Sequence, residues 1–366
     1  MSMQIPFVDL KKRYIEEKDE LQIIIDNVLS SGQLVLSQDV ADLEDSISKF
    51  LDVKYCLTLN SGTDALMMAL WALGVSKGDE VITSTVSFIA TAGAIAHVGA
   101  IPIFVNCNNE LNINVDEIEK KISNKTKAII PVHWTGRMAD IIRVREIASK
   151  YNIPVIEDAA QAIGSSINNI KPGQISKVAC FSSHPLKALN GIGDAGYLVT
   201  NEKDIYEKIK LYRNHGLIER DNAEIFGVNS RMDSINAAII KMRLKKLESI
   251  IYRRKKNIDF YIKNIKSSRF RIIEDKDNEK NSYTMFVALA ENRNELKNFL
   301  QGYGIESLVY YGNPLHKHNA SIKLKQDYSD LVFSENICDM VISIPFHQHL
   351  NEDELIYIAD KINRFY

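Results

Sequence analysis

The sequence has few of the features that mark a secreted, metal-binding or nucleic-acid-binding protein. Its 366 residues include only four cysteines, which are far apart, with no paired spacing and no histidine pattern beside them. This argues against a disulfide scaffold and a zinc site, and it indicates a reducing compartment. Basic and acidic residues nearly balance (45 against 47), so charge gives no argument for nucleic acid or an anionic membrane as a partner.

A targeting or membrane-spanning segment is also not evident. The first residues have no basic segment followed by an apolar run, so they do not resemble a signal peptide. Residues 81–109 contain no Asp, Glu, Lys or Arg and are long enough to cross a bilayer. Polar residues interrupt this stretch, so it is better predicted as a buried strand, helix and strand. We therefore expect a cytoplasmic protein without a membrane partner.

What the sequence does contain is a long alternation of β-rich runs and helical segments, up to about residue 215. Such alternation needs crossover connections, and it predicts an α/β fold with a mostly parallel sheet covered on both faces. Asn114 and Glu117 form a plausible capping box for one of the helices. The expected strands are 54–59, 80–84, 101–105, 128–132, 153–158, 178–182 and 196–200, and further helices are expected near 61–73, 88–98 and 139–150.

After Arg231 the pattern changes, and the length of the chain already suggests about two domains. We predict a large α/β domain over residues 1–245, including an N-terminal helical arm, and a smaller α+β domain over 246–366. The expected elements of this second part are a long helical stretch at 232–265, strands at 284–290 and 341–345, and helices near 293–302 and 351–364.

A basic run, Arg253 to Lys256, lies within the long helical stretch. We predict that it forms a solvated helix face, with a phosphate-binding patch as the alternative.

Three loops at strand ends carry residues suited to chemistry, and open α/β sheets bind ligands outside the carboxyl ends of their strands. Ser61, Gly62 and Thr63 precede a helix, so they suit either a bound phosphate or simple capping. Asp158 ends a strand, where an acid either caps the next helix or holds a proton on a ring nitrogen. Lys187 follows a strand and a proline, and a desolvated lysine there could form a Schiff base with an aldehyde.

The segment 191–196 matches the dinucleotide-binding pattern G-x-G-x-x-G, but a strand follows it where that fingerprint needs a helix. We predict a flexible turn beside Lys187 rather than a nicotinamide site.

Nine fragments, in this order along nearly the whole chain, resemble the DegT/DnrJ/EryC1/StrS family of sugar aminotransferases, which use pyridoxal 5′-phosphate (PLP). They are NSGTDAL, TVSFIATAGAIAHVGAIPIFV, PVHWTG, VIEDAAQAIG, FSSHPLK, GDAGYLVT, LYRNHG, NSRMDSINAAI and GIESLVYYGNPLH. The resemblance implies the PLP-dependent transferase fold type I, that of aspartate aminotransferase. Its large domain has a mostly parallel seven-stranded sheet between helices, and a smaller α+β C-terminal domain follows.

The family's motifs, carried over by position, imply that Lys187 is the Schiff-base lysine and that Asp158 is the partner of the pyridine nitrogen. Asn229 matches an asparagine that reaches the cofactor phosphate of the adjacent subunit, which implies a homodimer with shared active sites. The remaining cofactor contacts implied by the resemblance are Gly62, Thr63 and Ser182 at the phosphate, Phe88 on the ring, and Gln161 near the phenolic oxygen.

The implied reaction moves an amino group from L-glutamate, the donor that the family usually uses, to a keto group of a nucleotide-linked deoxysugar. The donor leaves as 2-oxoglutarate, and the cofactor alternates between PLP and pyridoxamine 5′-phosphate. We place His184, Tyr311 and His316 near the acceptor, although the two histidines could equally make ordinary structural hydrogen bonds. The sequence does not identify the acceptor's nucleotide or sugar.

Four alternatives remain open at this point. A dehydratase of the same family commonly has histidine in place of the Schiff-base lysine, so Lys187 counts against it. An aminotransferase acting on a smaller phosphorylated ketone is not excluded. A PLP-binding regulator would need a DNA-binding segment or basic face, and the sequence shows neither. A nicotinamide oxidoreductase depends only on the glycines of 191–196.

Overall fold

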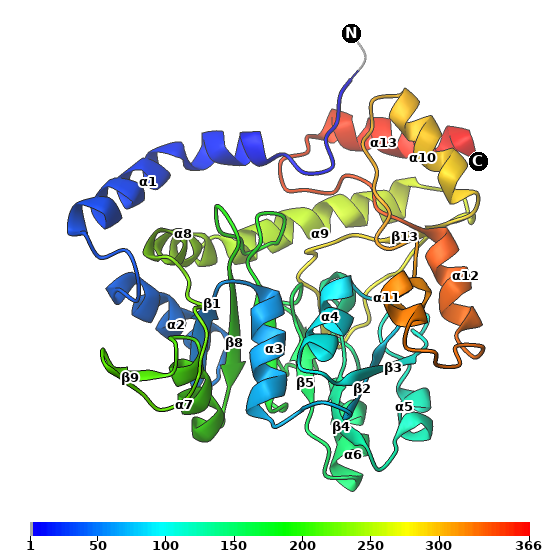
Figure 1. Ribbon diagram of the computed structural model, residues 1–366. Helices are drawn as coiled ribbons and strands as arrows, with labels where there is room; N and C mark the ends of the chain where they lie inside the picture. The colour runs from blue at the N-terminus through cyan, green and yellow to red at the C-terminus, as the bar shows by residue number, and fades with distance from the viewer. Residues whose placement is uncertain (1–2) are drawn as a thin grey trace.

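A seven-stranded sheet forms the centre of the computed structural model, which describes residues 3–366 (Figure 1). The group β3-β2-β4 joins the group β5-β7-β8-β1 through parallel bridges from Ile129 to Val155 and from Val132 to Asp158. Strand β8 runs antiparallel to both neighbours, and the other pairings are parallel, as predicted. The strands are β1 (Tyr55–Leu59), β2 (Glu80–Ser84), β3 (Ile101–Val105), β4 (Thr126–Ile130), β5 (Ile156–Asp158), β7 (Val178–Ser182) and β8 (Gly196–Thr200).

Helices cover both faces of this sheet because alternate residues of each strand point to opposite sides. In β8, Leu198 packs into a core with α3, α4 and α7. Its neighbours Tyr197 and Val199 pack into the core on the opposite face, together with α2 and α8. On this same face, α5 and α6 pack beside β2 and β4. The helices are α2 (Gln38–Leu51), α3 (Gly62–Ala72), α4 (Ile89–His97), α5 (Val115–Lys121), α6 (Ile141–Lys150), α7 (Lys203–Tyr212) and α8 (Ser234–Leu244).

The uncharged stretch 81–109 folds as β2, α4 and β3, which confirms its prediction as strand, helix and strand. Among residues 3–366, none of the helices combines the length and the apolarity that a bilayer span requires.

The C-terminal part packs helices around a small antiparallel sheet with the order β11-β13-β14. The strands predicted at 284–290 and 341–345 are shorter in the structure, because parts of both segments form backbone hydrogen bonds outside this sheet. Met285 donates its N–H to Thr135, and Ser343 exchanges backbone hydrogen bonds with Leu308. The elements are α9 (Leu247–Asn264), β11 (Phe270–Ile272), β13 (Ala288–Ala290), α10 (Arg293–Gly302), α11 (Asn319–Ile322), α12 (Val332–Met340), β14 (Val341–Ile342) and α13 (Glu352–Phe365).

The helical stretch 232–265 consists of two helices, α8 and α9, separated at Lys245 and Lys246. A tight turn ends the first helix, with the N–H of Lys246 donating to the carbonyl of Arg243. The domain boundary that we predicted falls in this break, and the division into domains stays a prediction.

The N-terminal segment contacts the C-terminal part of the chain before helix α1 (Leu10–Ser31) begins. Ile5 forms a parallel bridge with Ile305, and the N–H of Phe7 donates to the Glu306 carboxylate at 2.7 Å. Helix α1 then extends away along the upper left of the molecule (Figure 1). These first residues therefore contact the C-terminal elements, whereas α1 packs against α8; the assignment of the helical arm to the large domain stays a prediction.

The capping box expected at Asn114 forms only in part. Asn114 is the N-cap residue of α5, but its own N–H already donates to the carbonyl of Asn106. The Glu117 carboxylate therefore accepts from the N–H of Asn106 at 2.9 Å instead. A complete capping box opens α13, between Asn351 and Glu354.

Candidate active site

A cavity of about 480 Å³ lies where the carboxyl ends of the central strands meet the C-terminal part of the chain. Its wall contains most of the residues that the sequence singled out. Those that line it are Gly62, Thr63, Phe88, Asp158, Gln161, Ser182, His184, Lys187 and Tyr311. Asn229 and His316 are not among the lining residues.

One end of the cavity is an anion-binding arrangement at the start of α3. Ser61 caps the helix by accepting the N–H of Asp64 at 3.1 Å. A side chain at Gly62 would place its Cβ 2.9 Å from that of Ser182, so only glycine allows the helix start to approach the end of β7 so closely. The first N–H groups of a helix have no partner within it, and here the start of the helix lines the cavity together with Ser182. This combination suits a phosphate group.

The carboxyl group of Asp158 lies at the end of β5 and is only 5% exposed. Thr91 Oγ1 donates to Oδ2 at 2.7 Å, and the N–H of Ala160 donates to Oδ1 at 3.2 Å. Burial raises the pKa of this carboxyl group, whereas those hydrogen bonds and the charge of Lys187 act in the opposite direction. A cationic N–H group in the cavity would therefore stabilise the ionised form.

The amine of Lys187 is presented by a turn that follows β7. The backbone N–H of Lys187 donates to the carbonyl of His184 at 2.8 Å, which closes that turn. Burial lowers the pKa of Lys187 to about 8, and the charge of Asp158 partly opposes this. Within residues 3–366, the Nζ atom has no hydrogen-bond or ion-pair partner. With a pKa of about 8, roughly a tenth of the molecules carry a neutral amine at pH 7, far more than for an ordinary lysine.

Aromatic rings form another wall of the cavity. Phe88 is the N-cap residue of α4 and is half exposed, with its ring centroid 5.7 Å from that of Tyr311. Tyr311 lies in turn 5.1 Å from Trp134. Gln161 also faces this space, and its buried Oε1 atom has no hydrogen-bond partner. A flat heterocycle with a polar substituent would fit between these groups.

Two residues singled out from the sequence lie elsewhere. His316 is buried, with Nδ1 2.6 Å from Thr85 Oγ1 and Nε2 2.9 Å from the Glu335 carboxylate. It therefore makes structural hydrogen bonds, which was the alternative to a substrate contact. Asn229 is exposed outside the cavity and accepts a hydrogen bond from Arg231 Nε at 2.8 Å.

The prediction of a solvated basic helix face is wrong for Arg254. Arg253, Lys255 and Lys256 are exposed, but Arg254 is 4% exposed and lines the cavity. Arg254 lies on the buried face of α9, which its apolar residues mark: Ile250, Ile251, Ile258 and Tyr261 are buried at helical spacing around position 254. That periodicity was the signal in the sequence.

Other lining residues gave no signal in the sequence. Phe7 and Val8 come from the N-terminal segment, and Phe346 and His347 come from the loop before α13. Contacts between segments so far apart in the chain depend on the tertiary fold, and no local pattern marks them.

The glycine-rich segment 191–196 forms a turn that leads directly into β8, as predicted. A Cβ atom at Gly196 would lie 2.2 Å from the backbone carbon of Ser61, so this glycine lets the loop before α3 pack closely. The last glycine of the pattern therefore serves strand packing, which removes the argument for a nicotinamide site.

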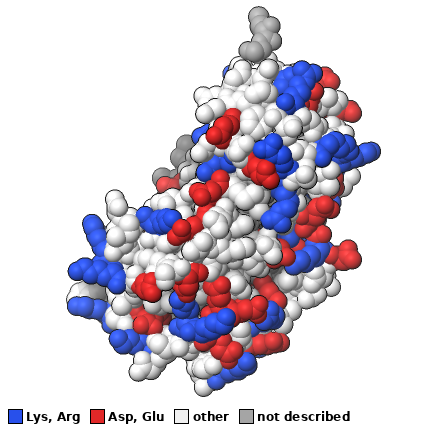
Figure 2. All heavy atoms as spheres, turned by 90° about the vertical axis from the view of Figure 1, so that its right-hand side faces the viewer, with Lys and Arg blue, Asp and Glu red and all other residues white. Residues whose placement is uncertain are grey.

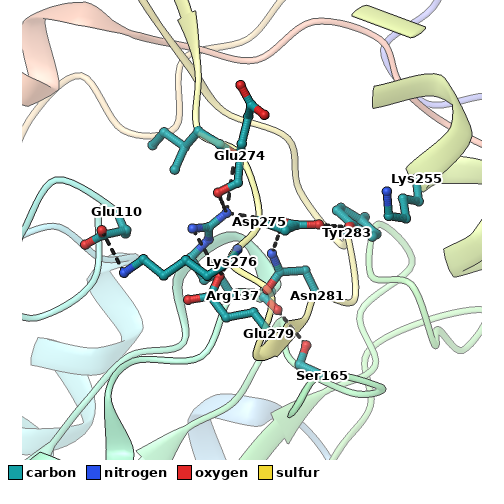
Figure 3. Close-up of polar contacts among 12 residues, drawn as sticks. Glu110, Arg137, Ser165, Lys255, Glu274, Asp275, Lys276, Glu279, Asn281 and Tyr283 are labelled. Carbon is teal, nitrogen blue, oxygen red and sulfur yellow. Dashed lines mark hydrogen bonds and ion pairs between the residues drawn. The ribbon is translucent and has the colours of Figure 1, made fainter. Parts of the chain in front are cut away.

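A second cavity, of about 180 Å³, lies around Arg137 (Figure 3). The Arg137 guanidinium donates to the carbonyl of Glu274 at 2.8 Å and lies 3.2 Å from the carboxylates of both Asp275 and Glu279. Tyr283 donates to Asp275 as well. The charge of Arg137 is balanced within the chain, so this cluster joins the central part to the segment 273–283.

Comparison with known proteins agrees with this geometry. The model of the DegT/DnrJ/EryC1/StrS aminotransferase family matches residues 15–363. The chain is 36% identical to UDP-2-acetamido-2-deoxy-3-oxo-D-glucuronate aminotransferase of Pseudomonas aeruginosa, over 95% of this chain and 96% of that protein. It is 34% identical to a protein of Geobacillus stearothermophilus named pleiotropic regulatory protein, over 100% of this chain and 99% of that one.

Among solved structures, that of S. venezuelae DesV in complex with a ketimine intermediate has a TM-score of 0.96 to this chain. The two are 31% identical, and the match covers 99% of this chain and 98% of DesV.

Proposed function

The chain belongs to the DegT/DnrJ/EryC1/StrS aminotransferase family, and on this premise we propose that it transfers an amino group from L-glutamate to a keto group of a nucleotide-linked sugar, with PLP as cofactor. One observation carries the proposal. The unpartnered amine of Lys187 and the buried carboxyl group of Asp158 line the same cavity, beside the phosphate-binding start of α3.

The lining residues fit PLP group by group. Gly62, Thr63 and Ser182 would hold the phosphate, and Asp158 would face the ring nitrogen. Phe88 would lie against the ring, and the buried, unpartnered Oε1 of Gln161 is positioned to accept a hydrogen bond from a polar ring substituent. PLP supplies an aldehyde that takes up the amino group and a ring that accepts electrons when the amino-acid carbon loses its proton.

Asp158 would keep a proton on the ring nitrogen. Its ionised form already accepts hydrogen bonds from Thr91 and Ala160, so the carboxylate is held in one orientation. Because Asp158 is buried, a charge-assisted hydrogen bond from the nitrogen would be stronger than one at the surface.

Lys187 would act as the proton carrier. Because burial lowers its pKa to about 8, the amine can take a proton from the substrate carbon and return it to the cofactor near neutral pH. Its place in the cavity wall sets the face on which the proton moves.

The nucleotide-sugar acceptor is supported by the relative that acts on a UDP-linked oxo-sugar. His184 and Tyr311 line the cavity and remain our proposed contacts for the acceptor. We do not extend this proposal to His316, since Thr85 and Glu335 already occupy both of its ring nitrogens.

We also propose a homodimer in which Asn229 reaches the cavity of the second subunit. The adjoining hairpin of β9 (Leu217–Glu219) and β10 (Asn222–Ala223) exposes large apolar side chains. Phe226, in the segment that follows the hairpin, is completely exposed, and Ile218 and Val228 are also exposed. Large exposed apolar residues gathered on one segment are typical of a protein interface.

A PLP-binding regulator is the second candidate, because one relative is named a regulatory protein. On the face drawn in Figure 2, however, basic and acidic side chains are interspersed over the surface, which does not suit nucleic acid.

Borohydride reduction tests the assignment of the lysine. The purified protein should be yellow, and reduction should attach the cofactor covalently to Lys187, as located by peptide mass spectrometry. Lys187→Ala should lose the adduct, whereas Lys177→Ala, at an exposed lysine paired with Glu202, should keep it. A label on a different lysine would overturn the assignment.

The acceptor is tested with protein carrying pyridoxamine 5′-phosphate. Nucleotide-linked keto-sugars and small keto-phosphates are added separately, and return of the yellow colour identifies the substrate. A protein that binds PLP but never exchanges amino groups would favour the regulator.

A further inference from the structure

Arg254 is a buried cation without a carboxylate partner. Its Nε atom donates to Gln348 Oε1 at 3.0 Å, and Nη1 donates to the carbonyl of Tyr283 at 3.0 Å. The guanidinium also lies 5.5 Å from the ring of Phe346. None of these partners is charged, and over residues 3–366 no Asp or Glu lies within ion-pair distance of Arg254.

Most of the other buried arginines do have a carboxylate nearby. Arg13 and Arg243 contact Glu17, Arg213 contacts Glu44, and Arg137 contacts two carboxylates. Arg293, which has none, lies outside the candidate active site. Burying a charge costs free energy unless the charge is paired. Arg254, which is unpaired and lines the cavity, is therefore suited to bind an anionic ligand.

Among residues 3–366 no carboxylate pairs with Arg254 itself, because the acidic groups closest to this end act on its neighbours: Asp9 on His347 and Glu16 on His349. Burial lowers its pKa to about 9, and the next contribution is repulsion from Arg13. His347, which also lines the cavity, has its pKa lowered to about 4 by burial and by His349, so its ring is neutral. Arg254 is therefore left as a buried cation whose charge a bound anion would neutralise.

We infer that Arg254 binds a carboxylate group of the amino donor. The inference rests on the proposed function, which requires the donor's amine to reach Lys187 in this same cavity. Amino acids bring a carboxylate with that amine. Since Nε and Nη1 already donate hydrogen bonds within the chain, only Nη2 remains for the ligand. The Arg254 side chain is 4% exposed, so it can bind a small planar anion but not a nucleoside diphosphate.

Two variants remove this anion site in different ways. Arg254→Met deletes the charge but also breaks the contacts with Gln348 and Tyr283. Gln348→Glu keeps the guanidinium and nearly the same shape, and it provides an internal carboxylate that competes with the donor. Gln348 itself is not a lining residue of the cavity. Arg253→Met, one residue away on the exposed face of α9, is the matched control.

The first measurement is a single-turnover titration, in which the loss of yellow colour is followed against donor concentration. For glutamate, both variants should raise the half-saturating concentration roughly 10- to 100-fold, as expected for a lost hydrogen bond between charged groups. The control should stay within about 2-fold. L-Alanine lacks the side-chain carboxylate and 4-aminobutyrate lacks the α-carboxylate, so whichever donor is affected shows which carboxylate Arg254 binds.

The second measurement is independent of turnover. Glutarate, a dicarboxylate without an amine, should raise the melting temperature of the cofactor-loaded wild type and of Arg253→Met, but not of the two variants. If Arg254→Met does not fold, Gln348→Glu decides the question.

The inference is wrong if the variants saturate with glutamate as the wild type does, or if only the sugar half-reaction is impaired. Failure of the proposed function looks different. In that case the wild type would not lose its colour with any amino acid, even though glutarate could still stabilise it through Arg254.

Discussion

Replacing Asp158 by asparagine should change the reaction rate and the folding stability in opposite directions. The side chain is almost completely buried, and it accepts hydrogen bonds from Thr91 and Ala160. An asparagine of the same shape can accept the bond from Ala160 through its amide oxygen and donate its amide N–H to Thr91 Oγ1, whose own hydrogen can turn to Ser87. It carries no charge, however, so it cannot hold a proton on a ring nitrogen in the way that a carboxylate does.

The expected loss follows from the electrostatic role. Removing a preorganised group that stabilises developing charge costs about 3–4 kcal/mol. At 1.36 kcal/mol for each factor of ten, Asp158→Asn should slow the half-reaction with glutamate by about 10²- to 10³-fold. Stopped-flow absorbance on the cofactor-loaded protein measures this rate directly.

Stability should change in the opposite direction. Because burial raises the pKa of Asp158, the folded cofactor-free protein binds this proton more tightly than the unfolded chain does. The wild type therefore loses stability as the pH rises from the ordinary carboxyl pKa through the raised one. Asparagine has no proton to lose, so the variant should lack this dependence and melt at the same or a higher temperature near neutral pH.

Asp277→Asn, at an exposed position in the loop before β12 (Glu279–Lys280), is the control for general effects of the substitution. A rate within a few-fold of the wild type would refute the electron-accepting role assigned to the ring. A large drop in melting temperature at neutral pH would refute the burial argument.

Three further outcomes are expected. In the cofactor-free protein, an amine-reactive reagent should modify Lys187 with a midpoint of about pH 8, because burial lowers its pKa; a midpoint near that of surface lysines would contradict this. Gly62→Ala should weaken PLP retention roughly 10-fold, measured by dialysis and absorbance, since the new methyl group would force Ser182 away. Phe226→Glu should shift the protein from dimer to monomer in analytical ultracentrifugation, whereas unchanged mass would exclude this residue from the interface.

The central sheet could be predicted from the sequence because its signals are local. Each strand is a short apolar run, and each loop that carries a candidate site residue follows such a run. The sequence therefore places Asp158 and Lys187 at strand ends, and the topology brings those ends to one cavity.

Features set by tertiary packing could not be found in this way. The break between α8 and α9 contains neither glycine nor proline, so nothing in the sequence marks it. The charge of its neighbours predicts a solvated Arg254, whereas the apolar periodicity of α9 places it toward the interior. The contact of Ile5 with Ile305 joins opposite ends of the chain, and no local pattern predicts it.

The wall of the active site spans the chain from Phe7 to His347. During synthesis, the loop that carries His347 leaves the ribosome near the very end, long after Asp158 and Lys187 have emerged. The cavity is therefore complete only when almost the entire polypeptide has been made, so a nascent fragment that ends at β14 lacks part of the wall around Asp158 and Lys187.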